Sequence, residues 1–350
     1  MHFRPNINKY RNTYRRNGGV VLAIILILAA AGCQKKQTAS KPLKVVRIGY
    51  FGNLTHAQAV LGVSSGEFAD AVRPLPLKTQ VFNAGPSLIE ALLAGEIDIG
   101  YVGPGPALNG YLKTDGEGLR VIAGAAANGV LIVARKDSSI TRFEDLTGKI
   151  IATPQEGNTQ DIAAKYYITH VLHQKNFNNI RPIPNAEQSG LMQRGEIDAA
   201  WAPEPWGSRL IAESGGHLVG AEKDLWPDHE FALTLVITTP DFLKYHPDVV
   251  RRILEVHHRW TARLQQDPQR YVSQLEDALY AINGKKLPRG VLKSSIKAVK
   301  FTDDPLADTI GTMADWAYEL DFARTRADVK GLLDTSLMDR IKAEDRAKGN

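Results

Sequence analysis

After residue 44, the spacing of the hydrophobic residues alternates between two patterns along the chain. Short runs rich in β-branched residues alternate with longer segments whose apolar residues recur at the spacing of an amphipathic helix. This alternation predicts an α/β fold with largely parallel sheets. The short runs predict strands at 45–49, 78–82, 97–102, 120–123, 130–134, 149–152, 180–183, 199–201 and 233–238, and the longer segments predict helices at 87–94, 161–173, 188–194, 249–267, 268–281 and 305–320.

The order of these elements repeats at long range. The tetrapeptide Gly-Glu-Ile-Asp occurs at 95–98 and again at 195–198, each time after a predicted helix and before a predicted strand. Upstream of each copy, the segments 47–59 and 149–163 both predict a strand, a Gly-Asn loop and a helix. Four common residues can recur by chance, but the shared order around them predicts two α/β lobes of like topology rather than one continuous sheet.

Two apolar runs lie where the predicted lobes join, GVLIVA at 129–134 and ALTLVIT at 232–238. We interpret these runs as two crossings of the chain between the lobes, with a helical C-terminal part that packs onto the first lobe. The predicted division is 45–129 for the first part of lobe one, 130–237 for lobe two and 238–345 for the second part of lobe one. The expected core residues of the C-terminal part are Trp260, Phe301 and Trp316.

Charge changes this picture only near the N-terminus. The 350 residues include 43 Lys and Arg against 38 Asp and Glu, a formal charge of +5 that could indicate a nucleic-acid or membrane partner. Five of the basic residues and none of the acidic ones fall in residues 1–32, so the remainder has 38 of each sign. The rest of the chain is therefore formally neutral, and we expect no nucleic-acid partner.

Residues 1–32 have the organisation of an export signal. A basic stretch ends at Arg16, an apolar run extends from Val20 to Ala31, and Cys33 follows. The run is too short to span a bilayer, which takes about 20 helical residues. Cys33 is the only cysteine, so it cannot form an intramolecular disulfide. Ala-Gly-Cys after an apolar run resembles a bacterial lipobox, which implies cleavage before Cys33 and lipidation of its sulfur.

Two alternatives stay open for this region. Cys33 could be a small buried residue behind an uncleaved signal anchor, and Arg15-Arg16 could belong to a twin-arginine signal, which Asn17-Gly18-Gly19 continues poorly. Residues 33–44 are polar and rich in lysine, which predicts a flexible tether. The expected location is the outer face of the cell membrane, reached through the lipid on Cys33.

The predicted lobes also place a binding site. Ligands bind outside the carboxyl ends of parallel strands, so two facing lobes put the site in the cleft between them. The loops expected there contain no Lys or Arg, and three lead into predicted helices, whose free N–H groups and dipoles can hold an oxyanion. The expected ligand-binding residues are Asn53, Thr55, His56, Ser87, Gly103, Pro104, Asn128, Asn158, Thr159, Trp201, Glu204 and Trp206.

Several of these residues also have a plain structural explanation. Asn53, Ser87 and Thr159 are good helix N-caps. Trp206 could belong to the core, or it could join Trp201 in an apolar wall for the carbon chain of a ligand.

Two titratable residues of the loops have competing interpretations as well. Glu204 could form an ion pair within the protein or bind a ligand amine, and His56 could face the cleft or merely begin a helix. Together they are the one candidate acid–base pair in these loops, so an enzyme on the same scaffold remains a rival hypothesis. A sensor that keeps the binding site without an importer is a third.

Two known motifs of catalytic and metal sites, the P-loop and H-E-x-x-H, are missing from the sequence. His170 and His173 share a predicted helix, and His257 and His258 are adjacent on another, but neither pair has carboxylates at ligand spacing. We expect no catalytic residue, no metal and no cofactor.

The chain resembles the nitrate/sulfonate/taurine-binding family of substrate-binding proteins of ABC importers, which shares its fold with the pyrimidine-binding proteins. The resemblance covers residues 45–330. It rests on the lipobox with Cys33, Ile48-Gly49-Tyr50, Gly95-Glu96-Ile97-Asp98, Gly103-Pro104-Gly105-Pro106, Phe143-Glu144-Asp145-Leu146-Thr147-Gly148-Lys149, Glu204-Pro205-Trp206 and Phe242-Leu243-Lys244-Tyr245-His246-Pro247.

This resemblance implies a type II periplasmic-binding-protein fold, in which two lobes close over an anion. It also implies delivery of the ligand to a membrane permease with an ATPase partner, and we expect a monomer. The absence of Lys and Arg from the loops favours the sulfonate branch over the nitrate branch. A taurine-like ligand would need an acid for its amine, for which Glu204 is the candidate. Nitrate and a thiamine-precursor pyrimidine remain alternatives.

Overall fold

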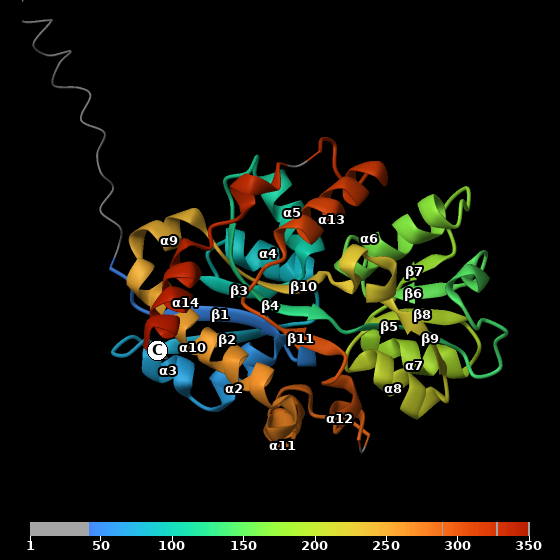
Figure 1. The fold of residues 1–350 in the computed structure, drawn as a ribbon, viewed down its shortest axis with the longest axis horizontal. Coiled ribbons are helices and arrows are strands. Elements are labelled where there is room, and N and C mark those ends of the chain that lie inside the picture. Colours follow the sequence, from blue (N-terminus) through green and yellow to red (C-terminus); the bar gives the residue numbers. More distant parts are fainter. Residues whose placement is uncertain (1–41, 289, 327, 349–350) are drawn as a thin grey trace, which may run out of the picture. The chain divides into compact units, whose positions relative to one another are not determined.

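Two sheets organise the part of the chain that the computed structural model describes, residues 42–288, 290–326 and 328–348 (Figure 1). The predicted signal, Cys33 and most of the tether lie outside the described residues, so cleavage and lipidation remain predictions. Within the described ranges, no helix is both long enough and apolar enough to cross a membrane.

The first sheet combines early and late segments of the chain, in the order β11-β4-β10-β3-β1-β2. β1 pairs in parallel with β2 and β3, whereas β10 and β11 run antiparallel to their neighbours. Every residue of β3 and β10 is buried, so both faces of the sheet are covered at its centre. The strands are β1 Val46–Phe51, β2 Leu77–Phe82, β3 Ile99–Val102, β4 Arg120–Asn128, β10 Ala232–Thr238 and β11 Val299–Phe301.

The second sheet has the order β7-β6-β8-β5-β9. β6 pairs in parallel with β7 and β8, and β5 runs antiparallel to β8 and β9. This order matches β2-β1-β3-β10-β4 in the first sheet, so the predicted duplication is confirmed. The strands are β5 Val130–Ala134, β6 Ile151–Thr153, β7 Ile180–Pro182, β8 Ala199–Pro203 and β9 His217–Ala221.

The repeated Gly-Glu-Ile-Asp has the same structural role in both lobes. Each glycine follows a helix with a positive φ, 71° in the first copy and 73° in the second, a conformation that suits glycine. The carboxylate of Asp98 accepts a hydrogen bond from the backbone N–H of Arg47 (2.8 Å), and that of Asp198 accepts one from Ile150 (2.9 Å). Each aspartate thus fixes the start of the neighbouring parallel strand.

The chain passes between the sheets at the two predicted places, but each apolar run belongs to a single sheet. β4 ends at Asn128 and β5 begins at Val130, so Gly129 alone separates the two strands. β10 lies between β3 and β4, so the chain has returned to the first sheet by Ala232, earlier than the expected limit at 237. Three of the five strand pairings in the first sheet and two of the four in the second are antiparallel, so the prediction of largely parallel sheets was wrong.

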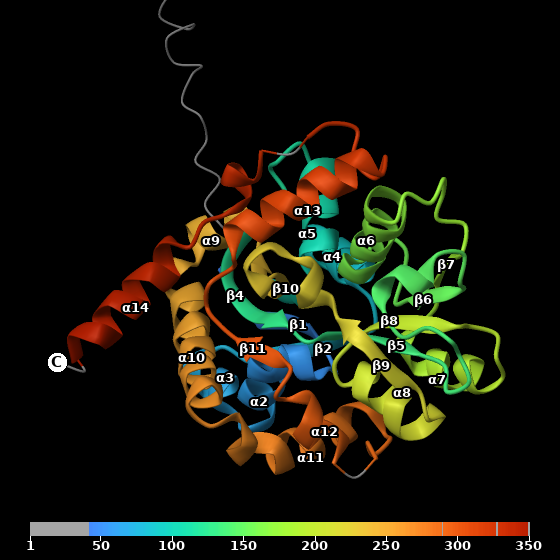
Figure 2. The ribbon, with the colours of Figure 1, turned by 45° about the vertical axis from the view of Figure 1, so that its right-hand side comes forward.

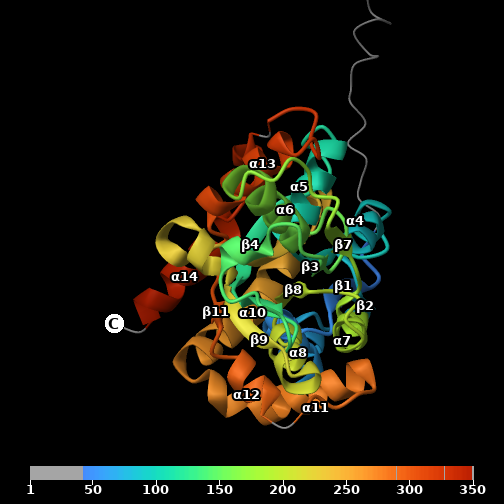
Figure 3. The same cartoon turned by 90° about the vertical axis from the view of Figure 1, so that its right-hand side faces the viewer.

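Helices cover the faces of both sheets. Figure 2 shows α13 across α5 and beside α6, and Figure 3 shows α11 and α12 at the opposite edge from α13. The described helices are α2 Ala57–Ser64, α3 Glu67–Ala71, α4 Gly85–Leu93, α5 Pro104–Lys113, α6 Thr159–Tyr166, α7 Asn185–Gln193, α8 Trp206–Ser214, α9 Pro240–Tyr245, α10 Pro247–Gln266, α11 Val272–Asn283, α12 Val291–Ser295, α13 Ala307–Glu319 and α14 Ser336–Lys348.

Two helices differ from their predictions in ways that matter for the site. α5 begins at Pro104, inside a segment expected to be a loop, because proline is well tolerated at the first position of a helix. The helix expected over 161–173 ends as an α-helix at Tyr166 and continues as a short π-helix to Val171. Of the expected C-terminal core residues, Trp260 and Phe301 are buried, and Trp316 is only partly buried.

Candidate functional site

A cavity of about 370 Å³ opens at the carboxyl ends of the parallel strands of both sheets. The first sheet contributes residues at the ends of β1, β2 and β3, the second sheet contributes residues at the ends of β6, β7 and β8, and β10 adds two more. The lining residues are Phe51, Asn53, Thr55, His56, Asn83, Ala84, Gly103, Pro154, Gln155, Asn158, Thr159, Gln160, Pro182, Pro184, Asn185, Pro203, Leu233 and Thr234.

The lining of this cavity carries no formal charge. None of the described residues that form it is Lys, Arg, Asp or Glu, and its one histidine is His56. Burial lowers the pKa of His56 to about 3, so the imidazole is neutral at physiological pH. The backbone N–H of Phe51 donates to His56 Nδ1 (3.3 Å), which leaves the ring proton on Nε2. His56 therefore supplies an N–H donor without a positive charge.

Four helices begin at the cavity. The N-cap residues of α4, α5 and α6 are Ala84, Gly103 and Asn158, and the first residue of α7 is Asn185; all four line it. The first N–H groups of a helix have no partner within the helix, and its N-terminus carries the positive end of the dipole. The converging termini can therefore hold an anion without a basic side chain.

Three side-chain amides add unpartnered acceptors. Asn53 Oδ1, Gln155 Oε1 and Asn185 Oδ1 are buried and, within the described residues, have no hydrogen-bond partner. An unpartnered buried acceptor costs about 1–3 kcal/mol. A ligand that also carries N–H or O–H donors would supply the partners that these oxygens lack among the described residues.

The structure brings half of the predicted site residues together at this cavity. Three of them follow β1 and precede α2, one lies between β3 and α5, and two are the N-cap and first residue of α6. They are Asn53, Thr55, His56, Gly103, Asn158 and Thr159.

Three other predicted residues lie outside the cavity lining. Ser87 is exposed, and its hydroxyl donates to the carbonyl of Ala84 (2.9 Å), which closes the first turn of α4. Pro104 is the first residue of α5 and follows the lining residue Gly103. Asn128 ends β4, where its Oδ1 accepts the N–H of Phe231 (3.2 Å) and so fixes the crossing between the sheets.

Trp201 and Glu204 are structural residues of the second lobe. Trp201 is fully buried in β8, and its indole N–H donates to Glu222 Oε2 (2.6 Å). Glu204 is 1% exposed and accepts hydrogen bonds from the N–H (3.0 Å) and hydroxyl (2.6 Å) of Ser208, so it caps the start of α8. Burial raises the pKa of Glu204. Neither residue is among those that line the cavity, and the carboxylate of Glu204 is engaged within the protein.

Trp206 lines an adjoining cavity of about 420 Å³ instead. This second cavity adjoins the first, so Trp206 lies beside the site rather than inside it. The two cavities share Phe51, Asn53, Asn83, Pro184 and Asn185. Its indole ring faces the guanidinium of Arg209, whose central carbon lies 5.2 Å from the ring centroid.

Sequence reasoning missed several lining residues that the strand-end rule could have found. Asn185 and Pro184 follow the predicted strand 180–183, and Gln155 follows the predicted strand 149–152. Thr234 gave no such signal, because it lies within β10 rather than at a strand end.

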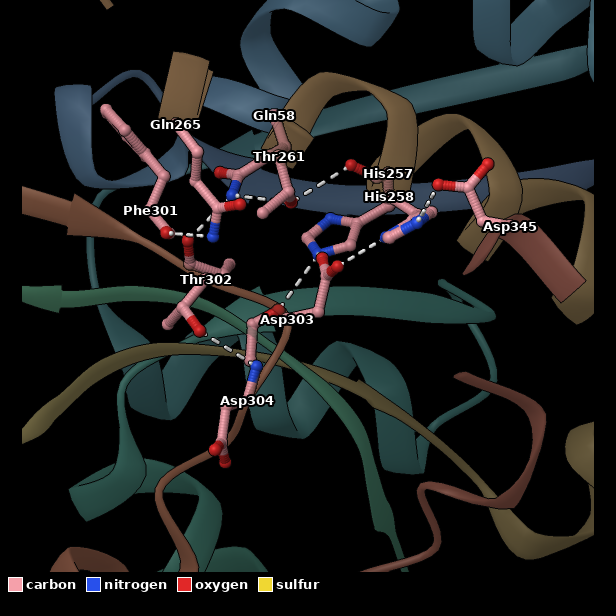
Figure 4. Close-up of polar contacts among 12 residues, drawn as sticks. Gln58, His257, His258, Thr261, Gln265, Phe301, Thr302, Asp303, Asp304 and Asp345 are labelled. Atoms are coloured by element: carbon pink, nitrogen blue, oxygen red, sulfur yellow. Dashed lines mark hydrogen bonds and ion pairs between the residues drawn. The ribbon is translucent and has the colours of Figure 1, made fainter. Parts of the chain in front are cut away.

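The other candidate chemistry of the sequence finds no counterpart at the cavity. Of the predicted acid–base pair, His56 lines the cavity and Glu204 does not. No group of three or more His, Cys, Asp or Glu within the described ranges is arranged to hold a metal ion. The adjacent pair His257 and His258 bonds to protein groups, as Figure 4 shows for its contacts with Asp303.

Comparison with known sequences agrees with this geometry. The NMT1-like family matches residues 39–274. A putative aliphatic sulfonates-binding protein of Bacillus subtilis is 26% identical over 342 residues, which cover 95% of this chain and 98% of that protein. The taurine-binding periplasmic protein of Escherichia coli is 29% identical over 185 residues, 49% of this chain and 52% of that protein.

Solved structures share the fold at low sequence identity. The alkanesulfonate-binding protein SsuA of Xanthomonas axonopodis pv. citri, bound to MOPS, has a TM-score of 0.68 and 19% identity, with 84% of this chain and 99% of that chain covered. The periplasmic nitrate-binding protein NrtA of Synechocystis PCC 6803 has a TM-score of 0.73 and 12% identity, with 87% and 89% covered. The predicted periplasmic-binding-protein fold is therefore confirmed.

Proposed function

The chain belongs to the NMT1-like family, and on that premise we propose that it is the extracytoplasmic substrate-binding component of an ABC importer. It captures an aliphatic sulfonate or a related small oxyanion between its lobes and delivers it to a permease that works with an ATPase. The relatives named above as sulfonate- and taurine-binding proteins support this ligand class.

The observation that carries the proposal is the uncharged cavity with four helix N-termini at its wall. A sulfonate is fully ionised at physiological pH and has three oxygens that accept hydrogen bonds. The N–H groups at the starts of α4, α6 and α7, the hydroxyls of Thr55 and Thr159 and the neutral N–H of His56 supply donors for these oxygens. Nitrate has the same requirement, so it remains the alternative anion.

Capture by closure follows from the placement of the donors on both lobes. Thr55 and His56 follow β1 of the first sheet, and Asn158 and Thr159 follow β6 of the second. A ligand that contacts both sets binds the closed arrangement more tightly than an open one, so binding shifts the population towards closure. No acid–base pair lines the cavity among the described residues, which supports binding without turnover.

The unpartnered amide oxygens favour a specific second candidate. Asn53, Gln155 and Asn185 would accept hydrogen bonds from a ligand with N–H donors, such as the amine of taurine or an aminopyrimidine. Taurine combines such a donor with a sulfonate and so uses both features of the cavity.

We further propose that the lipid on Cys33 holds the protein at the outer face of the membrane as a monomer. Residues 33–44 then form a short tether that lets the lobes reach the permease.

Calorimetry of the purified protein against ethanesulfonate, taurine, nitrate and an aminopyrimidine tests this function. We expect saturable binding of at least one sulfonate. Thr55→Val, which removes one buried hydroxyl at nearly constant volume, should weaken that binding roughly tenfold or more, because a hydrogen bond to a charged group is lost.

Ser87→Ala is the matched control, because it removes an exposed hydroxyl outside the cavity and should leave the affinity unchanged. If calorimetry detects no binding of any of the four ligands, the proposed ligand class is wrong. Binding of the aminopyrimidine alone would transfer the function to the pyrimidine branch.

A further inference from the structure

The starts of α5 and α6 meet across the cleft beside the cavity. α5 follows β3 of the first sheet, and α6 follows β6 of the second. The backbone N–H of Gly105 on α5 donates a hydrogen bond to the hydroxyl oxygen of Thr159, the first residue of α6 (3.2 Å). The side-chain amide of Asn109 donates to the carbonyl of Gly157 (3.4 Å), one turn further along α5. Two hydrogen bonds therefore join the lobes at this edge.

The first of these bonds supplies a helix cap that α5 lacks. Its N-cap residue is Gly103, which has no side chain to accept a hydrogen bond, and the next residue, Pro104, has no N–H. Gly105 consequently carries the first free N–H of the helix, a donor without a partner in α5 itself. Thr159 caps this donor from the opposite lobe.

The approach of the two helices is close enough to require glycine. A Cβ atom on Gly105 would lie 2.9 Å from the backbone nitrogen of Thr159, 3.1 Å from the carbonyl carbon of Asn158 and 3.2 Å from the carbonyl oxygen of Gly157. A Cβ on Gly103 would lie 2.5 Å from Thr159 Oγ1. These three nearest atoms belong to the backbone, which cannot turn aside as a flexible side chain can, so a side chain at Gly105 requires the lobes to separate.

A third helix reinforces the same contact. α13 packs against both α5 and α6, as Figure 2 shows. Trp316 of α13 stacks on Tyr166 of α6, with ring centroids 4.5 Å apart and planes at 14°. Phe322, just after α13, lies near the ammonium of Lys165 on α6 (4.8 Å to the ring centroid). The contact between α5 and α6 is thus part of a packed interface and not an isolated pair of atoms.

Thr159 belongs to this interface and to the cavity at once. It is 1% exposed and lines the cavity, and within the described residues its hydroxyl has one hydrogen bond, in which the oxygen accepts. The hydroxyl proton therefore remains available for an acceptor in the cavity. We propose that Thr159 couples ligand capture to lobe closure, because its hydroxyl oxygen caps α5 across the cleft while its proton binds an oxygen of the ligand. This inference rests on the proposed function, since it takes the ligand to be an oxyanion.

The coupling is tested by two substitutions of Thr159, one that removes the hydroxyl and one that keeps it. Thr159→Val keeps the shape and removes both hydrogen bonds, whereas Thr159→Ser keeps them. We expect Thr159→Val to weaken ethanesulfonate binding by more than tenfold and to speed hydrogen exchange of the Gly105 amide, whether or not ligand is added. Thr159→Ser should restore both properties to near wild-type values, which a purely structural role of the side-chain volume would not do.

The close approach is tested by replacing Gly105, with Gly311 as the matched control. Both residues lie within helices at negative φ, where alanine is the better helix former, but a Cβ on Gly311 would meet its nearest atom at 3.8 Å. Gly105→Ala should enlarge the radius of gyration in solution scattering and weaken binding at least tenfold. Gly311→Ala should change neither.

The outcomes separate this inference from the proposed function. A wild-type protein that binds none of the sulfonates or nitrate contradicts the function, and the proposed coupling is then wrong with it, whatever the exchange at Gly105. A wild-type protein that binds ethanesulfonate, together with an unaltered affinity in Thr159→Val or an unaltered affinity and radius in Gly105→Ala, overturns the coupling and leaves the function intact.

Discussion

His56 at the cavity and His258 on α10 are both largely withdrawn from solvent, yet their pKa values are shifted in opposite directions. Burial alone acts on His56 and lowers its pKa to about 3. His258 Nδ1 donates a hydrogen bond to Asp303, and that bond raises its pKa above the ordinary value. The contrast shows that the pKa of a buried histidine depends on its hydrogen-bond and charge partners as well as on its burial.

Two regions of the molecule are thus compared, the cavity that His56 lines and the cluster that contains His258. This His–Asp cluster is formed by His257, His258, Asp303 and Asp345 (Figure 4). The two histidines lie on α10, Asp303 follows β11, and Asp345 lies on α14, so the cluster ties three distant segments together. Burial by itself raises the pKa of Asp303, but the close approach of His257 and the hydrogen bond from His258 outweigh it and hold that pKa well below its usual range.

Tyr101 of β3 stands between the two regions. Its hydroxyl lies 3.0 Å from His257 Nδ1, and its ring centroid lies 6.5 Å from that of His56. His257 Nε2 donates to the carbonyl of Gly124 (2.9 Å), so its Nδ1 accepts the proton of the tyrosine hydroxyl. The protein thus places its buried ion pair in the framework and leaves the neighbouring cavity without charge.

This separation has a consequence for recognition. A charged residue in the cavity would attract any ligand of opposite sign, whereas uncharged donors in fixed positions reward a ligand whose acceptors match them. The ionised cluster, in turn, holds α10 and α14 on the first sheet, and none of its four residues lines the cavity.

Among the substitutions that test this contrast, Asp303→Asn should lower the free energy of unfolding the most. It leaves His257 and His258 without their carboxylate in a buried setting, where removing one partner of an ion pair costs about 3–5 kcal/mol. We expect a loss of about 3 kcal/mol in the free energy of unfolding at pH 6, measured by urea denaturation.

Asp345→Asn is the control for this loss. Asp345 faces the same His258, at 3.5 Å from Nε2, but its side chain is 69% exposed. An exposed pair contributes little, so the expected loss is no more than about 0.5 kcal/mol. Equal losses in the two variants would show that burial does not distinguish the two carboxylates.

The cavity and the His–Asp cluster differ in how well the sequence predicts them. The reason is that different interactions determine where their residues lie. The cavity follows from topology, because residues after parallel strands must gather at one edge of a sheet; Asn53, Asn158 and Thr159 were found in this way. The same rule also named Glu204 and Asn128, whose side chains turn to Ser208 and to Phe231 N–H instead. The rule places a loop, but local hydrogen bonds decide where its side chains point.

The His–Asp cluster had no sequence signal of comparable strength. His257 and His258 precede Asp303 by more than 40 positions, and only the packing of α10 against the segment after β11 brings them together. The start of α5 was missed for a different reason. Pro104 and Pro106 are typical of loops, yet at the first turn of a helix a proline removes no internal hydrogen bond.

The dependence of the free energy of unfolding on pH below about 6.5 tests the neutral state of His56. Its folded pKa of about 3 lies below the unfolded value of about 6.5, so between these limits the unfolded chain binds a proton that the folded chain does not. Stability is therefore lost as the pH falls below the unfolded pKa. Relative to His56→Asn, whose Oδ1 can still accept the Phe51 N–H, the wild type should lose about 2 kcal/mol between pH 6 and pH 4.5.

The measurement is the difference between the two urea-denaturation profiles across this pH range. Glu222, whose pKa burial raises to about 7, titrates in the same window with the opposite sign, but it is present in both proteins and cancels in the difference. Parallel profiles would mean that His56 becomes protonated in the folded protein, and the cavity would then bind anions with a charge that rises in acid.

The smallest expected effect is the change in the free energy of unfolding between pH 6 and pH 9, which depends on His258. Its folded pKa is raised above the unfolded value, so its contribution is fully present below the unfolded pKa and is lost as the pH rises through the folded pKa. Asp303 and Asp345 are the carboxylates that face it, and the lowered pKa of Asp303 keeps that group ionised over this range. The wild type should therefore lose about 0.5 kcal/mol relative to His258→Asn between pH 6 and pH 9, a small value because solvent reaches part of the pair. A wild-type advantage that grows with pH would place His258 in the same class as His56 and remove the distinction between the two regions.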